Sequence, residues 1–586
     1  MTRRIFLLLL LLIALGALII STPMVAADYD MWWHIKYGEI FVLNQTWLID
    51  HSQFSWVPAS ADWPYVTWIG SSLIYGLFKI VSLQGMYILP LVGLLTVGAL
   101  YFLHLKRQKV PVDELAIATF FFTMIVSFSQ LVRPTIFSNI FFALCLLIYF
   151  SSRYSPSSKT YYRFLPFIFL LWVNTHGSFL MGLAFLTLAC CLDAASNFLS
   201  KQHSNAEDRS KTRSLAIALL FSYGVLIINP YGFRYLFAIV DHLLFASHLE
   251  GQSGLITEYM SLWSRLDPTK ITLRPMQAGY TSIAMMASLL LFSAYSYSKT
   301  KVIPVTILGL NILFFLSGMA VSRALVFFCL VWLFSFAQLI SLSKDIIPRR
   351  KVNVSAAALT ILFSLNAFYL MFSYSPMLSW FGPALYAEYP IKEVEFLLEH
   401  KLPAPLLNDY LSGGYLIWAA YPKYKVFIDS RGGPYLGSTY MDSFAIEKAK
   451  TPDDLRPLLN KYPAKTIFMN WGQMNVIDAL LRMPEWKLVY FDKAAAIFVH
   501  ESESALIRNL LTSTDMGPGR FSMVENPDKL ISLFHMYSNL KSPAAMAKIE
   551  EIYARNVRST YLMKRNDIKS MESIIKAYEK LPSKSF

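Results

Sequence analysis

Two aspartates and a histidine close together near residue 30 form the most chemically suggestive segment of this sequence. They stand in the run Asp28-Tyr-Asp-Met-Trp-Trp-His34. If the run begins a helix, Asp30 and His34 share one face, because side chains four residues apart are neighbours on a helix. Two carboxylates beside an imidazole can act as a general base or bind a divalent ion such as Mg²⁺ or Mn²⁺. The segment therefore predicts catalytic roles for Asp30, Asp28 and His34, with metal binding by the same three residues as one form of that chemistry.

The same segment also has a structural interpretation. Aspartate is a favoured helix N-cap, so Asp28 or Asp30 can cap a helix whose Trp32 and Trp33 anchor it at the membrane interface. The sequence leaves both interpretations open. Both can hold at once, because a cap residue and its neighbour can do different jobs.

Two arginines in apolar surroundings suit a phosphate group. Arg133 stands in Leu-Val-Arg-Pro-Thr, and Arg323 stands in Gly-Met-Ala-Val-Ser-Arg. A guanidinium is a planar cation that can pair bidentately with phosphate. The alternative is that each arginine snorkels to lipid headgroups. For at least one of the two we expect substrate binding.

Four further residues are candidates for substrate binding. Asn174 and His176 lie in Trp-Val-Asn-Thr-His-Gly-Ser, and Tyr231 lies in Asn-Pro-Tyr-Gly-Phe-Arg. Arg431 follows a short apolar run, and ligands tend to sit at strand ends in α/β sheets. Two of them have a structural alternative, since a lone histidine such as His176 is usually structural and glycine pairs such as those near Arg431 are typical of turns.

The composition is that of a membrane protein. Of 586 residues, 55% are hydrophobic and 15% are charged, whereas about 25% of the residues of a soluble protein are charged. Mean hydropathy is +0.44. The net charge of +14 lies mostly in short loops between apolar blocks, where it indicates topology and does not suggest nucleic acid as a partner. Walker, Gly-x-Ser-x-Gly, His-Glu-x-x-His and dinucleotide motifs are missing from the sequence, which argues against ATP-driven transport and soluble-type hydrolysis.

The apolar blocks predict a polytopic protein with about eleven transmembrane helices. The segment 67–83 is expected to lie along the membrane surface, because basic loops such as 104–109 and 344–351 then fall in the cytoplasm. The first block, 5–20, is expected to remain as a span, although Val25-Ala26-Ala27 resembles a signal-cleavage site. The candidate residues of the loops then all fall on the extracytoplasmic side, which predicts a single outer-leaflet pocket.

The sequence predicts three parts. They are a transmembrane domain over 1–376 with a first extracytoplasmic loop at 24–84, an extracytoplasmic α/β domain over 385–500, and a helical tail over 501–586. In the second part, short apolar runs alternate with helix-like segments, which is typical of a small α/β domain. These runs are Pro405–Asn408, Lys425–Asp429, Thr466–Met469, Lys487–Phe491 and Ala494–Val499.

Several motifs together resemble a large group of bacterial multi-pass membrane proteins, over about residues 25–435. The motifs are Asp28-x-Asp-x-Trp-Trp-His-Ile-x-x-Gly38, Arg133-Pro-x-x-Phe-Ser138, Leu171-Trp-Val-Asn-x-His-Gly-Ser178, Asn229-Pro-Tyr-Gly232, and Gly413-Gly-Tyr-Leu-Ile-Trp followed by Tyr-Lys-Val-Phe-Ile-Asp-x-Arg431. The group is similar to the GT-C glycosyltransferases, which include protein mannosyltransferases and oligosaccharyltransferases.

This resemblance implies a GT-C-like fold in the bacterial inner membrane. It also implies a polyprenyl-phosphate or polyprenyl-diphosphate sugar donor, and Asp28 or Asp30 as the base or metal-binding carboxylate. The chain has Asn408-Asp-Tyr where an oligosaccharyltransferase carries a Trp-Trp-Asp-type motif, so asparagine is not implied as the acceptor.

The function expected from the sequence is transfer of a sugar from a polyprenyl-phosphate-linked donor to a glycan, lipid or protein acceptor outside the cell. One alternative is a transporter or flippase of polyprenyl-linked glycans, although the inverted repeats typical of transporters are not evident in the sequence. Another is a non-catalytic scaffold of envelope assembly, with the terminal helices recruiting partners.

The predicted topology can be tested with reporters that are active only outside the cytoplasm. A fusion after residue 376 should be active and a fusion after residue 109 should be silent, because the positive-inside rule places these two points on opposite sides. The reverse result at either position would contradict the predicted topology.

Overall fold

The protein is described by a computed structural model, which divides into two compact units. One comprises Met1–Thr22, Pro64–Leu73 and Tyr87–Ala367, and the other comprises Pro23–Trp63, Ile74–Met86 and Phe368–Phe586. The segment Val25–Ala27, which resembles a signal-cleavage site, lies outside the described residues, and the predicted domain boundaries stay predictions. The structure describes residues 2–21, 28–127, 131–154, 160–199, 206–241, 261–262, 273–300, 303–343, 349–374, 389–435, 437–557 and 561–579.

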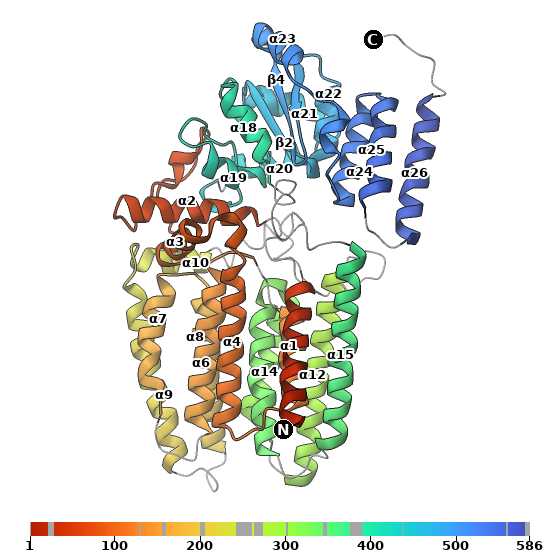
Figure 1. The fold of residues 1–586 in the computed structure, drawn as a ribbon. Coiled ribbons are helices and arrows are strands. Elements are labelled where there is room, and N and C mark those ends of the chain that lie inside the picture. Colours follow the sequence, from red (N-terminus) through yellow and green to blue (C-terminus); the bar gives the residue numbers. More distant parts are fainter. Residues whose placement is uncertain are drawn as a thin grey trace. The chain divides into compact units, whose positions relative to one another are not determined.

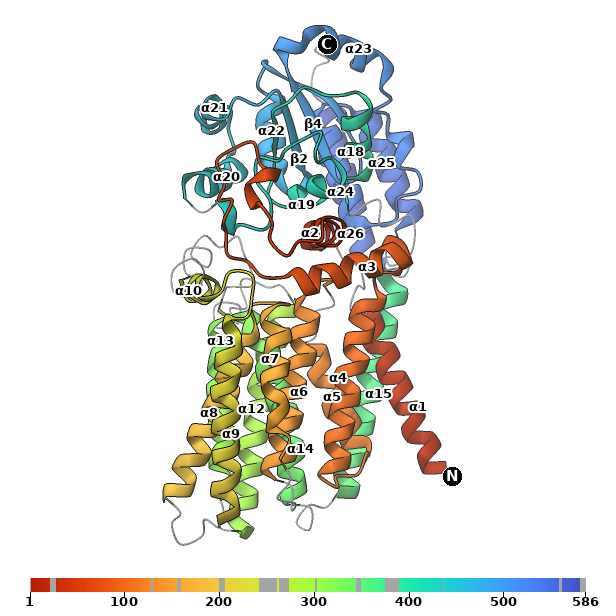
Figure 2. The same cartoon turned by 90° about the vertical axis from the view of Figure 1, so that its left-hand side faces the viewer.

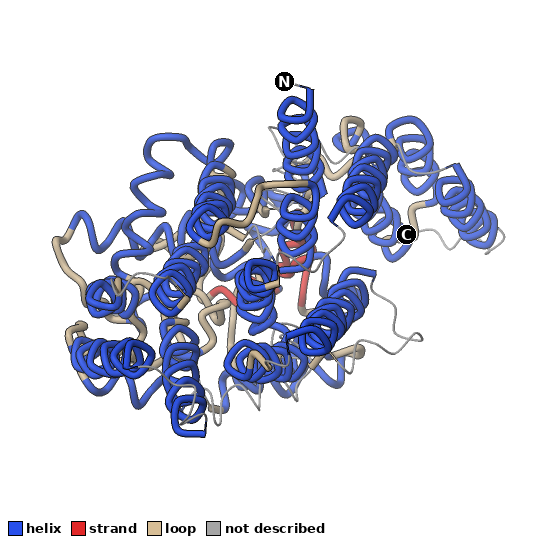
Figure 3. The backbone as a smooth tube through the Cα atoms, turned by 90° about the horizontal axis from the view of Figure 1, so that it is seen from below, coloured by secondary structure: helices blue, strands red, loops and turns tan. Residues whose placement is uncertain are grey.

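The first unit is a bundle of α-helices, most of which run side by side, whereas α10 lies across them (Figure 1, Figure 2). Figure 3, viewed from below, shows many of them nearly end-on. The helices are α1 (Thr2–Ser21), α4 (Ile88–Arg107), α5 (Glu114–Ser127), α6 (Thr135–Arg153), α7 (Leu165–Val173), α8 (Phe179–Leu199), α9 (Ala206–Gly224), α10 (Phe233–Asp241), α12 (Leu273–Thr300), α13 (Val305–Ala320), α14 (Leu325–Leu342) and most of α15 (Arg349–Tyr374).

The apolar blocks predicted at 5–20 and 67–83 coincide with the described helices Thr2–Ser21 and Trp68–Gly85. Seven of the described helices are long and apolar enough to cross a membrane, and four shorter ones are apolar, including Trp68–Leu83. The chain is thus a multi-pass helical protein. The count of eleven spans, the surface position of 67–83 and the side on which each loop lies stay predictions. The segment 67–83 forms helix α3 (Trp68–Gly85), whose first residues belong to the first unit and whose remaining residues belong to the second.

The second unit contains a small mixed sheet with strand order β1-β2-β4-β3. Strands β1 and β2 are parallel, with Leu407 opposite Ile467, and the other two pairings are antiparallel. This confirms the predicted C-terminal mixed α/β fold. The strands are β1 (Leu406–Asn408), β2 (Thr466–Asn470), β3 (Trp486–Phe491) and β4 (Ala495–His500), and the accompanying helices are α18 (Ile391–Glu399), α19 (Ser412–Ala419), α20 (Ser438–Lys448), α21 (Pro452–Lys461) and α22 (Met474–Leu481).

Four of the five apolar runs predicted as strands belong to this sheet, and Lys425–Asp429 does not. Val426 instead pairs with the first loop: its N–H donates to the Phe54 carbonyl at 2.8 Å, and its carbonyl accepts from Trp56 N–H at 3.2 Å. Val426–Asp429 are buried, as residues of a central strand would be, but the hydrogen-bonding partner of Val426 is the segment around η1 (His51–Phe54), far away in the sequence.

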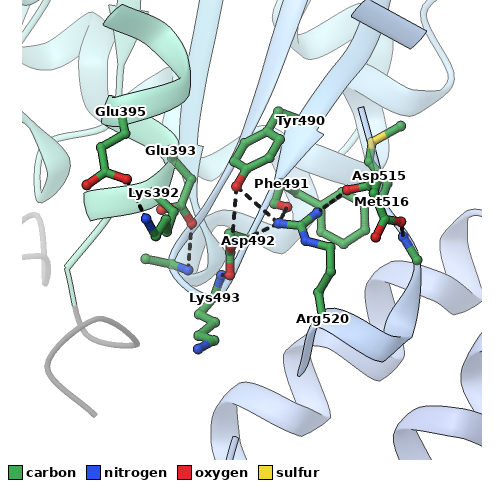
Figure 4. Close-up of polar contacts among 12 residues, drawn as sticks. Lys392, Glu393, Glu395, Tyr490, Phe491, Asp492, Lys493, Asp515, Met516 and Arg520 are labelled. Atoms are coloured by element: carbon green, nitrogen blue, oxygen red, sulfur yellow. Dashed lines mark hydrogen bonds and ion pairs between the residues drawn. The ribbon is translucent and has the colours of Figure 1, made fainter. Parts of the chain in front are cut away.

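The helical tail follows the sheet as α23 (Ser504–Ser513), α24 (Pro527–Asn539), α25 (Pro543–Asn556) and α26 (Tyr561–Glu579). Figure 4 shows how Arg520, which lies between α23 and α24, contacts the end of β3 and the β3–β4 turn. The Arg520 guanidinium lies 2.8 Å from the Asp492 carboxylate and donates to the Tyr490 hydroxyl at 3.0 Å. Nearby, burial and the Asp492 carboxylate raise the pKa of Glu393 to about 7. The tail therefore forms part of the second unit and is not a loose extension.

Candidate functional site

The first helix of the second unit, α2 (Tyr29–Leu43), begins at the acidic pair. Asp28 is its N-cap, and one carboxylate oxygen accepts a hydrogen bond from Asp30 N–H at 3.3 Å. Asp28 is 2% exposed, whereas Asp30 is partly exposed. The capping interpretation therefore describes Asp28, and Asp30 is the carboxylate of the pair that solvent or a substrate can reach more readily.

Asp30 and His34 lie one turn apart on α2, as the spacing predicts. The Asp30 carboxylate accepts a hydrogen bond from Trp33 Nε1 at 3.2 Å. His34 is 2% exposed, and the centroid of its ring lies 3.6 Å from the ring centroid of the adjacent Trp33. Trp33 thus contacts both groups and orients the carboxylate.

The two tryptophans of this segment do not serve as interface anchors. Both are 3% exposed. Trp32 packs edge-on against Tyr389 and Tyr415, with ring centroids 5.0 and 4.7 Å away. Both side chains are therefore buried within the second unit, Trp32 among aromatic rings of the same unit. The interpretation of Trp32 and Trp33 as membrane-interface anchors is wrong.

The Gly413-Gly414 pair lies inside α19, where it lets two segments approach closely. A Cβ added at Gly414 would lie 2.4 Å from the Tyr29 carbonyl oxygen, and one added at Gly413 would lie 2.2 Å from the Ile428 carbonyl oxygen. Contacts below 3.0 Å force atoms to shift, so only glycine permits this packing. Gly414 is therefore needed for α2 to pack on α19, Gly413 is needed for the segment at Ile428 to approach α19, and neither is a turn residue.

Arg431 occupies the centre of a buried network. It forms a bidentate ion pair with Asp429, with both N···O distances 2.7 Å and both side chains 0% exposed. Its remaining N–H groups donate to the Tyr37 hydroxyl at 2.8 Å, the His51 carbonyl at 3.0 Å and the Tyr435 hydroxyl at 3.1 Å. An arginine has five N–H donors, and these contacts engage all five. Arg431 thus ties the first loop to the C-terminal part of the unit, and we expect a positioning role for it instead of substrate binding.

His51 is neutral in this network. Burial, together with the positive charge of Arg431, lowers the pKa of His51 to about 3. Its Nδ1 lies 2.5 Å from the Tyr37 hydroxyl. Because that hydroxyl accepts from Arg431, it is available to donate to His51, and the three groups form an ordered chain of hydrogen bonds.

Asn408-Asp409 closes the carboxyl end of β1. The Asp409 carboxylate accepts from Ser412 N–H and Asn470 N–H, both at 2.9 Å, and burial raises its pKa. The Asn408 side chain accepts from Phe427 N–H and donates to the Ile428 carbonyl, both at 2.8 Å. These hydrogen bonds hold the end of β1 in place. The polar side chains of Asn408 and Asp409 thus have a structural role that does not require a ligand.

In the first unit, Arg133 and Arg323 line one pocket of about 240 Å³. This volume is below the roughly 300 Å³ at which sites for drug-sized ligands begin, so it suits a headgroup better than a whole lipid. The pocket contains no carboxylate among its described lining residues. The lining residues are Val126, Leu131, Arg133, Thr135, Ser138, Asn139, Ser178, Ser322, Arg323, Leu325, Val326 and Phe327.

His176 lies beside this pocket without lining it. Burial, then the positive charges of Arg323 and Arg133, lowers the pKa of His176 to about 3. Its Nδ1 accepts from Ser178 N–H at 3.2 Å, so the proton of the neutral ring is on Nε2. At physiological pH His176 is therefore neutral and adds no third positive charge beside the two arginines.

Asn174 and Tyr231 are placed outside this pocket. Asn174 accepts from Trp68 Nε1 at 2.9 Å and donates to the Leu170 and Ile228 carbonyls at 2.9 and 2.8 Å, so its amide joins three segments. Tyr231 lies in a turn held by the Asn229 side chain. The structure thus brings together the two predicted arginines and, next to them, His176. Asp28, Asp30, His34 and Arg431 belong to the other unit, and the single pocket predicted for the loop residues stays a prediction.

Some polar residues of these sites were not singled out from the sequence. Thr135, Ser138 and Asn139 follow Arg133 at the start of α6, and Ser322 precedes Arg323. Their adjacency to the arginines was a usable signal. Asp193, which is buried in α8 and pairs with Arg153 at 3.2 Å, was also not singled out, but it is not among the lining residues of the pocket.

A metal site is not formed by the described residues. No group of three or more histidines, cysteines, aspartates or glutamates among them is placed to hold an ion. Asp28 is engaged as a cap and His34 is buried against Trp33. The donor set predicted for Mg²⁺ or Mn²⁺ therefore does not fit a three-residue ion site.

No protein-family model and no curated protein matches the chain. Solved structures do match. The archaeal oligosaccharyltransferase AglB from Archaeoglobus fulgidus, in complex with an inhibitory peptide and a dolichol-phosphate, is 12% identical over 99% of this chain and 86% of its own, with a TM-score of 0.50. The same enzyme tethered to an acceptor peptide is 14% identical over 80% and 69%, at 0.49. ArnT from Cupriavidus metallidurans is 12% identical over 86% and 99%, at 0.38.

The likeness to AglB shows a shared fold. Oligosaccharyltransferases are GT-C glycosyltransferases, so the predicted GT-C-like fold is confirmed. At 12% identity the likeness says nothing about which substrates this chain uses.

The buried ion pair generates a prediction about stability. Arg431→Ala should destabilise the protein by about 3–5 kcal/mol, because the Asp429 charge stays buried without its partner. Arg456→Ala is the matched control: Arg456 pairs with Glu485 at 3.2 Å but is 48% exposed, and an exposed pair contributes about 0–1 kcal/mol. Unfolding of the purified variants, followed by tryptophan fluorescence, distinguishes the two. Equal stability of both variants would contradict the positioning role.

Proposed function

We propose that this chain is a membrane glycosyltransferase that takes a sugar from a polyprenyl-phosphate-linked donor and passes it to an acceptor hydroxyl on the extracytoplasmic side. The observation that carries the proposal is the pocket with Arg133 and Arg323. The archaeal oligosaccharyltransferase was solved with a dolichol-phosphate, and we propose a lipid of the same chemical class here because of the pocket.

The pocket suits a phosphate group in three ways. It contributes two guanidinium groups and no described carboxylate, so its charge is complementary to an anion. The first residues of α6 line it, and the N-terminus of a helix attracts anions through its backbone N–H groups and dipole. Its hydroxyl and amide side chains, such as Ser138 and Asn139, can supply further hydrogen bonds.

Asp30 is proposed as the general base. It takes the proton of the acceptor hydroxyl, and the acceptor oxygen bonds to the anomeric carbon of the donor sugar. The bond between that carbon and the phosphate oxygen breaks, and its electron pair leaves with the lipid phosphate. Two roles suffice, because phosphate is already a good leaving group: one group removes the proton and one holds the phosphate. No step is assigned to a metal ion.

The phosphate role of Arg323 predicts that lysine cannot replace it. Arg323→Lys keeps the charge but loses the planar fork that holds two oxygens at once. Binding of a polyprenyl phosphate to the purified protein should weaken about 10- to 100-fold, as expected for a lost hydrogen bond to a charged group. Arg234→Lys, in α10 and outside the pocket lining, is the control. Unchanged affinity in Arg323→Lys and Arg323→Ala would mean that the residue only reaches for headgroups.

The base role predicts a separate effect for Asp30→Asn. Sugar transfer should fall by about 10²–10⁴, the usual contribution of a general base, while polyprenyl-phosphate affinity and melting temperature stay near those of the wild type. Asp28→Asn is the comparison, because asparagine caps a helix about as well as aspartate. If both single variants and the double variant transfer sugar at the wild-type rate, the acidic pair has no catalytic role.

A further inference from the structure

The Ser138 hydroxyl stands in the wall of the arginine pocket. Ser138 lies in the first turns of α6, five residues after Arg133, and is 1% exposed. It lines the pocket together with Arg133 and Arg323. Its contacts decide whether its single proton is available to a ligand.

Trp172 fixes the position of this hydroxyl. Its indole Nε1 donates to Ser138 Oγ at 2.9 Å, and an indole N–H can only donate. The indole is fully buried and packs on Gly182 of α8, where an added Cβ would lie 2.4 Å from Trp172 Cζ3. The Ser138 oxygen therefore already accepts one bond from a rigid donor, and its own proton must point elsewhere.

His176 is the competing acceptor for that proton, and Ser178 already satisfies it. The Ser178 hydroxyl lies 2.8 Å from His176 Nδ1, and Ser178 N–H donates to the same atom at 3.2 Å. Ser138 Oγ is farther away, at 3.2 Å. An imidazole nitrogen has one lone pair, so the Ser138 proton can turn into the pocket at little cost. The Ser178 proton, by contrast, is committed to the ring.

We propose that Ser138 is a phosphate-binding residue that donates a neutral hydrogen bond to a phosphate oxygen of the lipid, next to Arg133 and Arg323. This inference rests on the proposed function. The arginines contribute positive charge. Ser138 contributes a hydrogen bond of fixed geometry, because Trp172 holds its oxygen in one place. Ser178 lines the same pocket but offers a ligand only lone pairs, so a phosphate oxygen selects Ser138 over Ser178.

The test compares binding of a polyprenyl phosphate and of the matching polyprenol to the full-length protein in nanodiscs. Ser138→Ala should weaken binding of the phosphate about tenfold or more, as expected for a lost hydrogen bond to a charged group, and leave polyprenol binding unchanged. Ser138→Thr keeps the hydroxyl and should restore most of the affinity for the phosphate. Ser222→Ala removes a buried serine that bonds within its own helix α9 and should change neither affinity.

The possible results separate this inference from the proposed function. An equal loss for phosphate and polyprenol in Ser138→Ala would show a structural role and overturn the inference, and so would an unchanged phosphate affinity. If Ser138→Ala does not fold, Ser138→Thr is the test variant. A loss of phosphate affinity in Ser138→Thr would then contradict the inference about Ser138. If the wild-type protein itself does not prefer the phosphate to the polyprenol, the proposed function fails instead.

Discussion

The buried ion pair between Asp429 and Arg431 is the interaction on which the placement of the acidic pair depends. Two charges can remain buried only if they pair with good geometry and their remaining donors and acceptors are satisfied. Here all five N–H groups of the arginine have partners, and two of these, Tyr37 and His51, come from the first loop. Removing the loop would leave the ion pair incomplete, so the loop and the C-terminal part of the unit must fold together.

That coupling extends along α2 to its N-terminus. Tyr37 joins the ion pair near the middle of the helix, and Gly414 lets the backbone at Tyr29 approach α19 closely. The helix is thus held at two places within one unit. Asp28 caps it and Asp30 sits in its first turn, so both carboxylates are positioned by a rigid element and not by a free loop.

The described lining of the arginine pocket differs in charge from this network. In the network of the second unit, each buried charge has its counter-charge within the protein. The described lining of the pocket instead combines two cations with neutral hydroxyls and an amide, and the adjacent His176 stays uncharged because burial and both arginines lower its pKa to about 3. The charge of this described lining is complementary to that of an anion.

Local sequence patterns predicted the helices and strands well, but they predicted poorly which segments contact one another. Long apolar blocks coincide with helices because length and hydropathy are local properties. The run Lys425–Asp429 has the pattern of a strand of the sheet, yet it pairs with the segment that contains Ser55. The Ser55 hydroxyl donates to the Val426 carbonyl, 371 residues away in the sequence. Arg431 at the end of that run resembles a ligand-binding residue, and only the tertiary structure shows that its donors are all used. Ser138 was missed for the converse reason, since a hydroxyl near a helix start is common and its availability depends on Trp172 and His176.

The central claim is that this GT-C fold transfers sugar from a lipid phosphate, and the most direct measurement is the appearance of free polyprenyl phosphate. Wild-type protein in nanodiscs would be incubated with a panel of radiolabelled polyprenyl-phosphate sugars and an extract of envelope acceptors, and the lipid products would be separated over time. We expect saturable release of polyprenyl phosphate, matched by label in the acceptor fraction, for at least one sugar. Tight binding of the donors with no release and no transferred label would contradict the claim and favour a transporter or a scaffold.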